Sequence, residues 1–155
     1  MNSLTLFRHA KTERDSATGR DFDRQLAERG QRDAARMGEE IRRLGLNYDL
    51  LLSSPAARAA ETASLAGRAA RYDDRIYDAS ACELLAIVQE ADDAVGRLIL
   101  IGHNPGFERL ASRLVGSNLE MPTGSLIEIQ MPGQWSEAGE AQGRMVRFLK
   151  PKELY

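Results

Sequence analysis

Two arginines and two histidines stand at the ends of apolar runs in the sequence. Arg8 and His9 come directly after a short apolar run near the N-terminus, and His103 follows, after Gly102, the unbroken apolar run 98–101. Arg58 lies one helical turn beyond a Ser-Ser-Pro segment that also ends an apolar run. The planar fork of arginine binds phosphate oxygens in pairs, and a neutral imidazole can attack phosphorus to form a covalent phosphoenzyme. The pattern predicts a phosphoryl-transfer site in which one imidazole attacks and the other groups hold the phosphate oxygens.

Less specific interpretations of these residues fit the joint pattern less well. A histidine after a strand is more often structural than catalytic, but both histidines of the chain occupy such positions. Imidazole is also a common metal ligand, yet metal sites usually recruit carboxylates or thiolates as well, and arginine repels a dication. The chain has neither a Walker A motif nor a Gly-x-Gly-x-x-Gly motif, so an NTPase or a dinucleotide-binding protein lacks support. We therefore predict a site that uses no metal ion and no cofactor.

The elements that would position these residues alternate between strands and helices. Short apolar runs predict strands, and apolar residues at helical spacing predict helices. The expected strands are 4–7, 48–52, 75–77, 98–101, 125–131 and 144–149, and the expected helices are 28–44, 55–67, one from Ser80, and 107–115. This alternation is typical of a three-layer α/β/α sandwich, a mostly parallel sheet with helices on both faces and a final hairpin at the edge. We expect residues 1–155 to form a single domain.

Individual residues mark where two of the helices should begin, and the strand directions indicate where the site should lie. Ser54 followed by Pro55 predicts a helix N-terminus, and Ser80 with Glu83 matches a capping box. Ligands of open α/β sheets bind beyond the carboxyl ends of the strands. Because parallel strands end at the same edge, we expect both histidines and both arginines to meet there.

Composition limits the class of partner and the compartment. The 155 residues carry a formal net charge of -2 with a pI of about 5.8, so the chain offers no general positive field for nucleic acid. No run reaches the roughly 18 apolar residues of a membrane span, and the N-terminus does not resemble a signal peptide. We expect a cytoplasmic protein without a membrane partner. The single cysteine, Cys82, falls within a helical pattern and is expected to be a buried or half-buried structural thiol.

Three segments in order along the chain resemble motifs of the histidine phosphatase superfamily, also called phosphoglycerate mutase-like. Leu6–Ala10 resembles the Arg-His-Gly/Ala motif, Ser53–Thr62 the Ser-Ser-Pro-x-x-Arg-Ala-x-x-Thr motif, and Gly102–Pro105 the Gly-His-Asn-Pro segment. The short length, the Arg-His-Ala-Lys opening and Met121–Ser125 resemble the SixA-type phosphohistidine phosphatases most. The resemblance implies the three-layer fold that the alternation of elements also predicts.

The resemblance also implies a role for each site residue. His9 is the implied nucleophile, and Arg8, Arg58 and His103 are the implied phosphoryl-binding residues. Asn104, at the start of the following helix, is a further predicted substrate contact.

The sequence departs from the family pattern at the general acid and after the first loop. Larger members carry a glutamate after the third strand, and the matching position here is Asp78, whose shorter side chain reaches less far. Glu83 is an alternative acid, although the capping box already explains it. The family's Arg-Pro-Leu-Thr is replaced by Arg24–Ala27, which predicts a looser start to the first helix.

Three functions remain open at this point. The enzyme could cleave phosphohistidine on a protein, a histidine-containing phosphotransfer domain being one candidate, or it could cleave small phosphate esters. A catalytically silent phosphoprotein-binding module is the third, but such a module has no need of the nucleophile His9. Imidazole is a better leaving group than an alkoxide, so an enzyme with a weak general acid should cleave phosphohistidine more readily than a phosphate ester. The short chain has no room for lid insertions, so the site should be open enough for a protein substrate. The same shortness argues against a phosphoglycerate mutase, since mutases of this type are longer. We also expect the protein to be a monomer.

Overall fold

The computed structural model describes residues 1–155 and is built around a six-stranded sheet. The strands in chain order are β1 (Asn2–Arg8), β2 (Leu50–Ser53), β3 (Arg71–Tyr72), β4 (Arg97–Gly102), β5 (Leu126–Met131) and β6 (Arg144–Leu149). Their order across the sheet is β3-β2-β4-β1-β5-β6. The first four strands are parallel, whereas β5 and β6 run antiparallel to their neighbours. The prediction of a mostly parallel sheet with a hairpin at its edge is confirmed.

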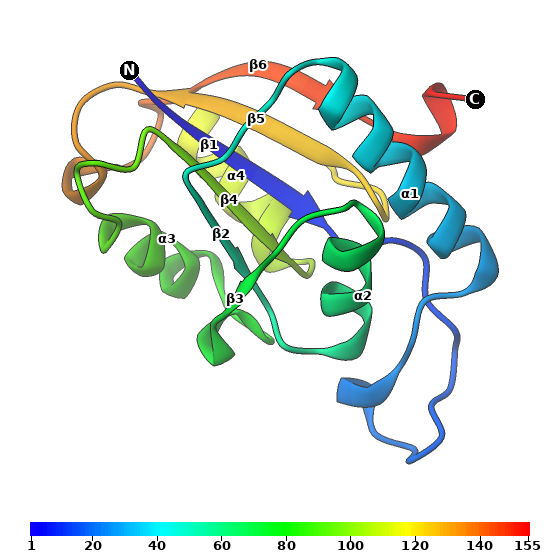
Figure 1. Ribbon diagram of the computed structural model, residues 1–155. Helices are drawn as coiled ribbons and strands as arrows, with labels where there is room; N and C mark the ends of the chain where they lie inside the picture. Colours follow the sequence, from blue (N-terminus) through cyan, green and yellow to red (C-terminus); the bar gives the residue numbers. More distant parts are fainter.

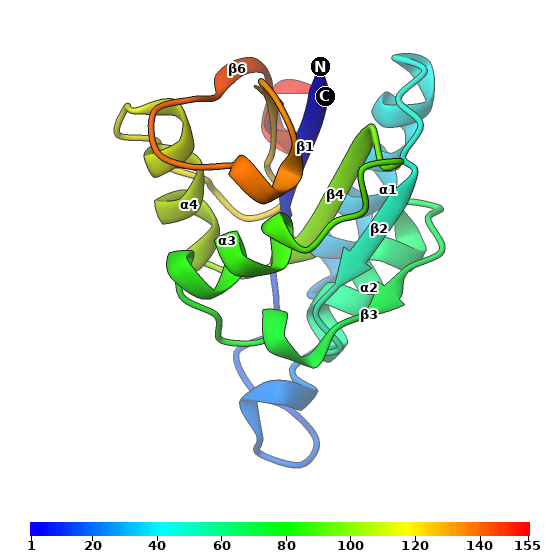
Figure 2. The ribbon, with the colours of Figure 1, turned by 90° about the vertical axis from the view of Figure 1, so that its left-hand side faces the viewer.

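Four helices cover the two faces of this sheet (Figure 1). They are α1 (Glu28–Arg43), α2 (Ala57–Leu65), α3 (Ala81–Gln89) and α4 (Gly106–Val115). Figure 2 shows α3 and α4 on one side of the strands and α1 and α2 on the other, which confirms the three-layer prediction. None of the helices combines the length and the apolar character that crossing a membrane requires.

The central strand β4 shows how the sequence specifies two covered faces. Leu98 and Leu100 pack in the cluster that includes α3 and α4, while Ile99 and Ile101 pack in the cluster that includes α1 and α2. All four side chains are completely buried. Successive side chains of a strand point to opposite faces, so an unbroken apolar run is what a strand covered on both sides requires.

The helix boundaries confirm some local predictions. Ser80 Oγ accepts a hydrogen bond from the Glu83 amide at 3.1 Å, and Glu83 Oε1 accepts one from the Ser80 amide at 3.0 Å, so the capping box is present. Helix α1 begins after Ala27, which provides no side-chain cap. The Ala27 amide instead donates to the Lys11 carbonyl at 2.9 Å, and this backbone bond anchors the end of the first loop.

Two expected element boundaries were wrong. The strand expected at 75–77 is instead a 3-10 turn, η2 (Asp74–Ile76), because the Asp73 side chain accepts a hydrogen bond from the Arg75 amide and turns the chain after β3. Helix α2 begins at Ala57 with Ala56 as its N-cap, not at Pro55 with Ser54 as its N-cap. Ser54 Oγ accepts a hydrogen bond from the Ala56 amide at 3.2 Å in the turn before the helix.

The expectation for Cys82 was also wrong, since its side chain is exposed. The buried face of α3 is formed by Ala81, Leu84, Ile87 and Val88. Cys82 follows Ala81 in the first turn and is rotated away from this face. Its Sγ accepts a hydrogen bond from the Arg113 guanidinium at 3.2 Å on the protein surface.

Candidate active site

The register of the two central strands brings the histidines together. Arg8 at the end of β1 lies opposite Gly102 at the end of β4. His9 and His103 are each the next residue in the chain, and their ring centroids are 5.3 Å apart. Both side chains are less than a tenth exposed. The predicted convergence of the two histidines at one edge of the sheet is therefore present.

Hydrogen bonds fix the ring orientation and the tautomer of His9. Nδ1 lies 2.7 Å from the Ala10 carbonyl oxygen. A carbonyl oxygen can only accept, so Nδ1 carries the proton and donates it. Nε2 then keeps its lone pair and makes no hydrogen bond within the chain. The backbone is held as well, because the His9 amide donates to Gly102 and its carbonyl accepts from Gly124.

His103 has the opposite arrangement of its two nitrogens. Its Nε2 lies 2.7 Å from Ser54 Oγ, which already accepts the Ala56 amide. The Ser54 hydroxyl has no other acceptor for its proton in the chain, so it donates to Nε2, and the ring proton then lies on Nδ1. That nitrogen is buried and has no hydrogen-bond partner in the chain. His103 thus offers one unused donor inside the site.

The two arginines are held by different parts of the chain. Arg8 Nη1 donates to the Met121 carbonyl at 2.7 Å, and its Nε is buried without a partner. Arg58 Nη1 donates to the Asp21 carbonyl at 2.8 Å, and its Nη2 donates to Asp21 Oδ2 at 2.9 Å. Arg8 directly precedes His9, and the Arg58 guanidinium lies 5.9 Å from the centre of the Tyr77 ring, which itself meets the His103 ring. Arg8, His9, Arg58 and His103 therefore form one group, which we call the cage.

The cage keeps both imidazoles neutral at physiological pH. Burial, together with the positive charges of Arg58 and Arg8, lowers the pKa of His9 to about 4 against the opposing effect of the Ala10 carbonyl. Burial likewise lowers the pKa of His103 to about 3, with His9 and Arg58 contributing. A neutral imidazole is the nucleophilic form. No group of three or more His, Cys, Asp or Glu side chains is arranged to hold a metal ion.

Asp21 and Tyr77 also belong to this site, although the sequence did not indicate them. The Tyr77 hydroxyl donates to Asp21 Oδ2 at 2.7 Å, and its ring meets the His103 ring edge-on at 5.6 Å. This hydrogen bond, followed by those from Arg24 and Arg58, holds the pKa of the Asp21 carboxyl well below its usual range. Asp21 begins a 3-10 turn, η1 (Asp21–Asp23), in the polar segment between β1 and α1. The only available signal was the need of a buried arginine for a carboxylate partner.

The remaining predicted residues lie around the cage with different contacts. Asn104 Nδ2 donates to the Met121 carbonyl at 3.0 Å, and its Oδ1 accepts the Glu108 amide, so it holds the start of α4. Its contact with substrate stays a prediction. Asp78 is exposed, has a left-handed backbone with φ of 58° and makes no side-chain hydrogen bond, so its role as acid also stays a prediction. The Glu83 carboxyl is occupied by the capping box, which lowers its pKa.

Known proteins share both sequence and structure with this chain. A model of the histidine phosphatase superfamily (branch 1) matches residues 4–83. A chloroplastic protein of Arabidopsis thaliana is 30% identical over 156 residues, which cover 90% of this chain and 72% of the relative. Two solved structures carry the provisional name of SixA phosphohistidine phosphatase. The one from Nakamurella multipartitia is 26% identical with a TM-score of 0.87 and covers 97% of this chain and 96% of its own. The one from Agrobacterium tumefaciens is 28% identical with a TM-score of 0.84 and covers 97% and 98%.

The family model covers β1 and the segment from β2 into α2. The two solved structures align with nearly the whole chain. They confirm the resemblance that the three sequence motifs indicated, and the similarity to SixA-type structures agrees with the short length. The chain belongs to the histidine phosphatase superfamily (branch 1).

Proposed function

We propose that residues 1–155 form a single phosphatase domain that removes phosphoryl groups from phosphohistidine on a protein, with His9 as the nucleophile. One observation carries the proposal: two buried donors of the cage, Arg8 Nε and His103 Nδ1, have no partner in the chain. An unsatisfied buried donor costs about 1–3 kcal/mol. Phosphoryl oxygens would satisfy both donors beside the free Nε2 of His9.

The first chemical step is a transfer between two imidazoles. The Nε2 lone pair of His9 attacks phosphorus while the P–N bond of the substrate breaks, and the electron pair of that bond stays on the leaving nitrogen. Nδ1–H of His9 remains bonded to the Ala10 carbonyl, so the ring becomes a phosphorylated imidazolium. Arg8, Arg58 and His103 stabilise the negative charge on the phosphoryl oxygens during transfer.

The second step returns the enzyme to its starting state. Water attacks phosphorus, the P–Nε2 bond breaks, and its electron pair returns to His9 as dihydrogen phosphate leaves. Because Nδ1 kept its proton throughout, His9 is again neutral. The Ala10 carbonyl contributes by holding that proton, since a ring that stays protonated is a good leaving group.

The leaving group favours phosphohistidine over a small ester. A substrate imidazole that is protonated on its second nitrogen departs as a neutral molecule and needs no acid. An alkoxide requires a proton from a well-placed donor, and here the proposed donor, Asp78, is exposed and unconstrained by hydrogen bonds. The provisional names of the two SixA-type relatives support the same substrate class.

A substrate comparison tests this proposal. We expect kcat/KM to be higher for a histidine-phosphorylated protein than for p-nitrophenyl phosphate and sugar phosphates. Rapid quenching should trap a phosphoenzyme that is labile in acid and stable in base, as a P–N bond is. A strong preference for a small ester would reject the phosphohistidine substrate. An acid-stable label would place the phosphoryl group on a serine such as Ser54 and reject His9.

A further inference from the structure

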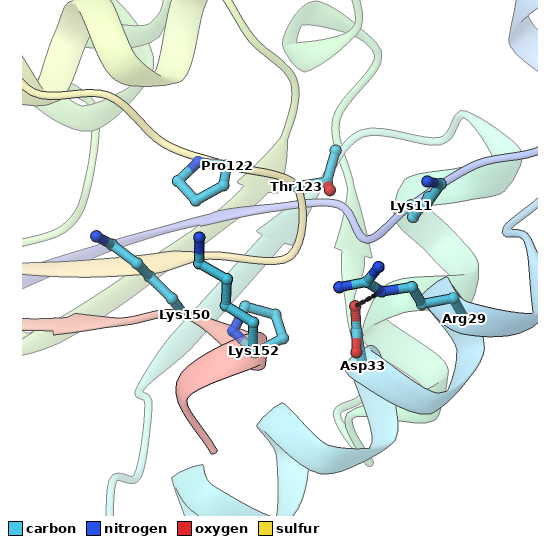
Figure 3. A pocket seen from close by; sticks show the side chains of 8 residues that line it. Lys11, Arg29, Asp33, Pro122, Thr123, Lys150 and Lys152 are labelled. Atoms are coloured by element: carbon cyan, nitrogen blue, oxygen red, sulfur yellow. Dashed lines mark ion pairs between the residues drawn. The ribbon is translucent and has the colours of Figure 1, made fainter. Parts of the chain in front are cut away.

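A hollow beside the cage gathers the lysines of the whole chain. The sequence has 21 Lys and Arg residues, and only three of these are lysine: Lys11, Lys150 and Lys152. All three line one pocket of about 170 Å³, which we call the lysine pocket. Its other lining residues are Arg29, Asp33, Pro122, Thr123 and Pro151. Figure 3 shows Lys11, Arg29, Lys150 and Lys152 around this hollow, although they come from three distant segments of the chain.

The lysine pocket has an excess of positive charge. Four cationic side chains and one carboxylate line it, which leaves a local net charge of +3 on a chain whose overall charge is -2. Asp33 is close to Arg29 at 3.8 Å and also accepts the Tyr155 hydroxyl at 2.9 Å. Lys11 and Lys152 make no side-chain hydrogen bond or ion pair in the chain. Two ammonium groups are thus left for an external anion.

Contacts within the protein hold the walls of the lysine pocket in place. The Lys11 carbonyl accepts the Ala27 amide at 2.9 Å, and a Cβ on Gly30 would lie 2.0 Å from that same carbonyl, so α1 packs closely on Lys11. Pro151 belongs to the turn η4 (Pro151–Glu153) and packs on Gly124, where an added Cβ would lie 2.9 Å from its Cγ. The backbone around the lysines is therefore fixed. The side chains of Lys11 and Lys152 remain free to reach a ligand, whereas Lys150 Nζ lies 3.8 Å from Glu153 Oε1.

The lysine pocket is next to the nucleophile. Lys11 lies two residues after His9, so their Cα atoms are at most about 7 Å apart. The opposite wall includes Thr123, whose neighbour Gly124 donates its amide to the His9 carbonyl at 2.8 Å. The lysine pocket is therefore close enough to the cage for one bound molecule to reach both.

The residue types distinguish this pocket from a second phosphoryl site. The cage uses arginines, whose fork matches phosphate oxygens in pairs, whereas lysine is a compact, hydrated charge on a flexible stem. The volume equals that of about six water molecules, which suits a side chain and not a helix. Exposed lysines at the edge of a binding site attract and orient an acidic protein surface. Carboxylates on a protein therefore fit better than a second phosphate.

We infer that the lysine pocket receives an acidic side chain of the phosphorylated protein, placed close to its phosphohistidine. The inference rests on the proposed function. The lysine pocket would supply the recognition of the substrate protein that the cage lacks. The cage binds only the phosphoryl group, which every phosphorylated molecule shares. The acidic contact would make the enzyme select proteins in which a carboxylate lies beside the phosphorylated histidine.

The test compares two double variants of the full chain. Lys150→Gln/Lys152→Gln removes two charges from the lysine pocket, and Arg42→Gln/Arg144→Gln removes two exposed charges from the far end of the molecule as a matched control. We expect the lysine variant to raise KM for a histidine-phosphorylated protein about tenfold at low salt with little change in kcat. Its kcat/KM for p-nitrophenyl phosphate should change less than twofold. High salt should narrow the difference in KM, because exposed charges are screened.

A binding measurement separates this inference from the proposed function. A fluorescent hexaglutamate peptide should bind the wild type and the arginine control alike, and the lysine variant about tenfold more weakly. A wild type that binds the peptide through these lysines but ignores phosphohistidine would reject the proposed function and retain the acidic ligand. Equal peptide binding by all three proteins, or an unchanged KM for the phosphorylated protein, would overturn the inference. Inorganic phosphate that binds the pocket more tightly than the peptide would overturn it as well.

Discussion

The cage and the lysine pocket are neighbours that hold positive charge in opposite ways. Arg58 is buried, and two hydrogen bonds to Asp21 hold its guanidinium group. Lys152 is exposed, and no partner in the chain holds its ammonium group. A preorganised charge stabilises a transition state without moving, whereas a mobile exposed charge chiefly affects encounter and affinity. This difference is why we propose that the cage carries out the chemistry and that the lysine pocket recognises the substrate protein.

The largest expected effect is the loss of the nucleophile. His9→Ala should abolish turnover of every substrate and remove the acid-labile phosphoenzyme, because no other neutral imidazole has a free lone pair in the cage. Thermal unfolding should show that the variant remains folded. Residual turnover of the phosphorylated protein at even a tenth of the wild-type rate would mean that His9 is not the nucleophile.

Removing one arginine of the cage should have the next largest effect. We expect Arg8→Ala and Arg58→Ala each to lower kcat/KM by about 10²-fold for the phosphorylated protein and for p-nitrophenyl phosphate alike. Arg144→Ala is the matched control at the far end of the sheet. A loss restricted to the protein substrate would contradict the division between cage and lysine pocket, because it would give an arginine the role assigned to the lysines.

Asp21 connects the first loop to the cage, so its effect should be intermediate. Asp21→Ala removes the carboxylate that holds Arg58 Nη2, although the backbone bond to Arg58 Nη1 remains. We expect a loss of about tenfold, mostly in kcat, as for one hydrogen bond to a charged group. Asp23→Ala is the control, since that carboxylate bonds Thr18 instead. A gain in activity would show that Asp21 competes with the phosphoryl group for Arg58.

The two regions also differ in how far the sequence could predict them. The strand ends at His9 and His103 were predictable because apolar runs end abruptly there and parallel strands share an edge. Asp21 was not predictable, since its contact with Arg58 depends on how a polar loop folds over α2. The lysine pocket joins residues 11 and 150, and no local pattern indicates that the C-terminal turn packs on Gly124. The turn at Asp73 and the exposed Cys82 were missed for a related reason, because side-chain hydrogen bonds and helix rotation decided them.

The smallest expected effect is a shift in titration that separates the cage from the lysine pocket without measuring turnover. The chain has only two histidines, so their ring resonances can be followed by NMR from pH 3 to pH 8. Burial lowers the pKa of His9 to about 4 and that of His103 to about 3, so both rings should remain neutral as the pH falls through 6.5, the ordinary value. Arg58→Ala should raise both pKa values, because a positive charge beside an imidazole disfavours its protonated form. Lys150→Gln/Lys152→Gln should leave both titrations unchanged. A histidine that titrates near 6.5 in the wild type would mean that the cage is open to water, and a response to the lysine variant would mean that the two regions form one site.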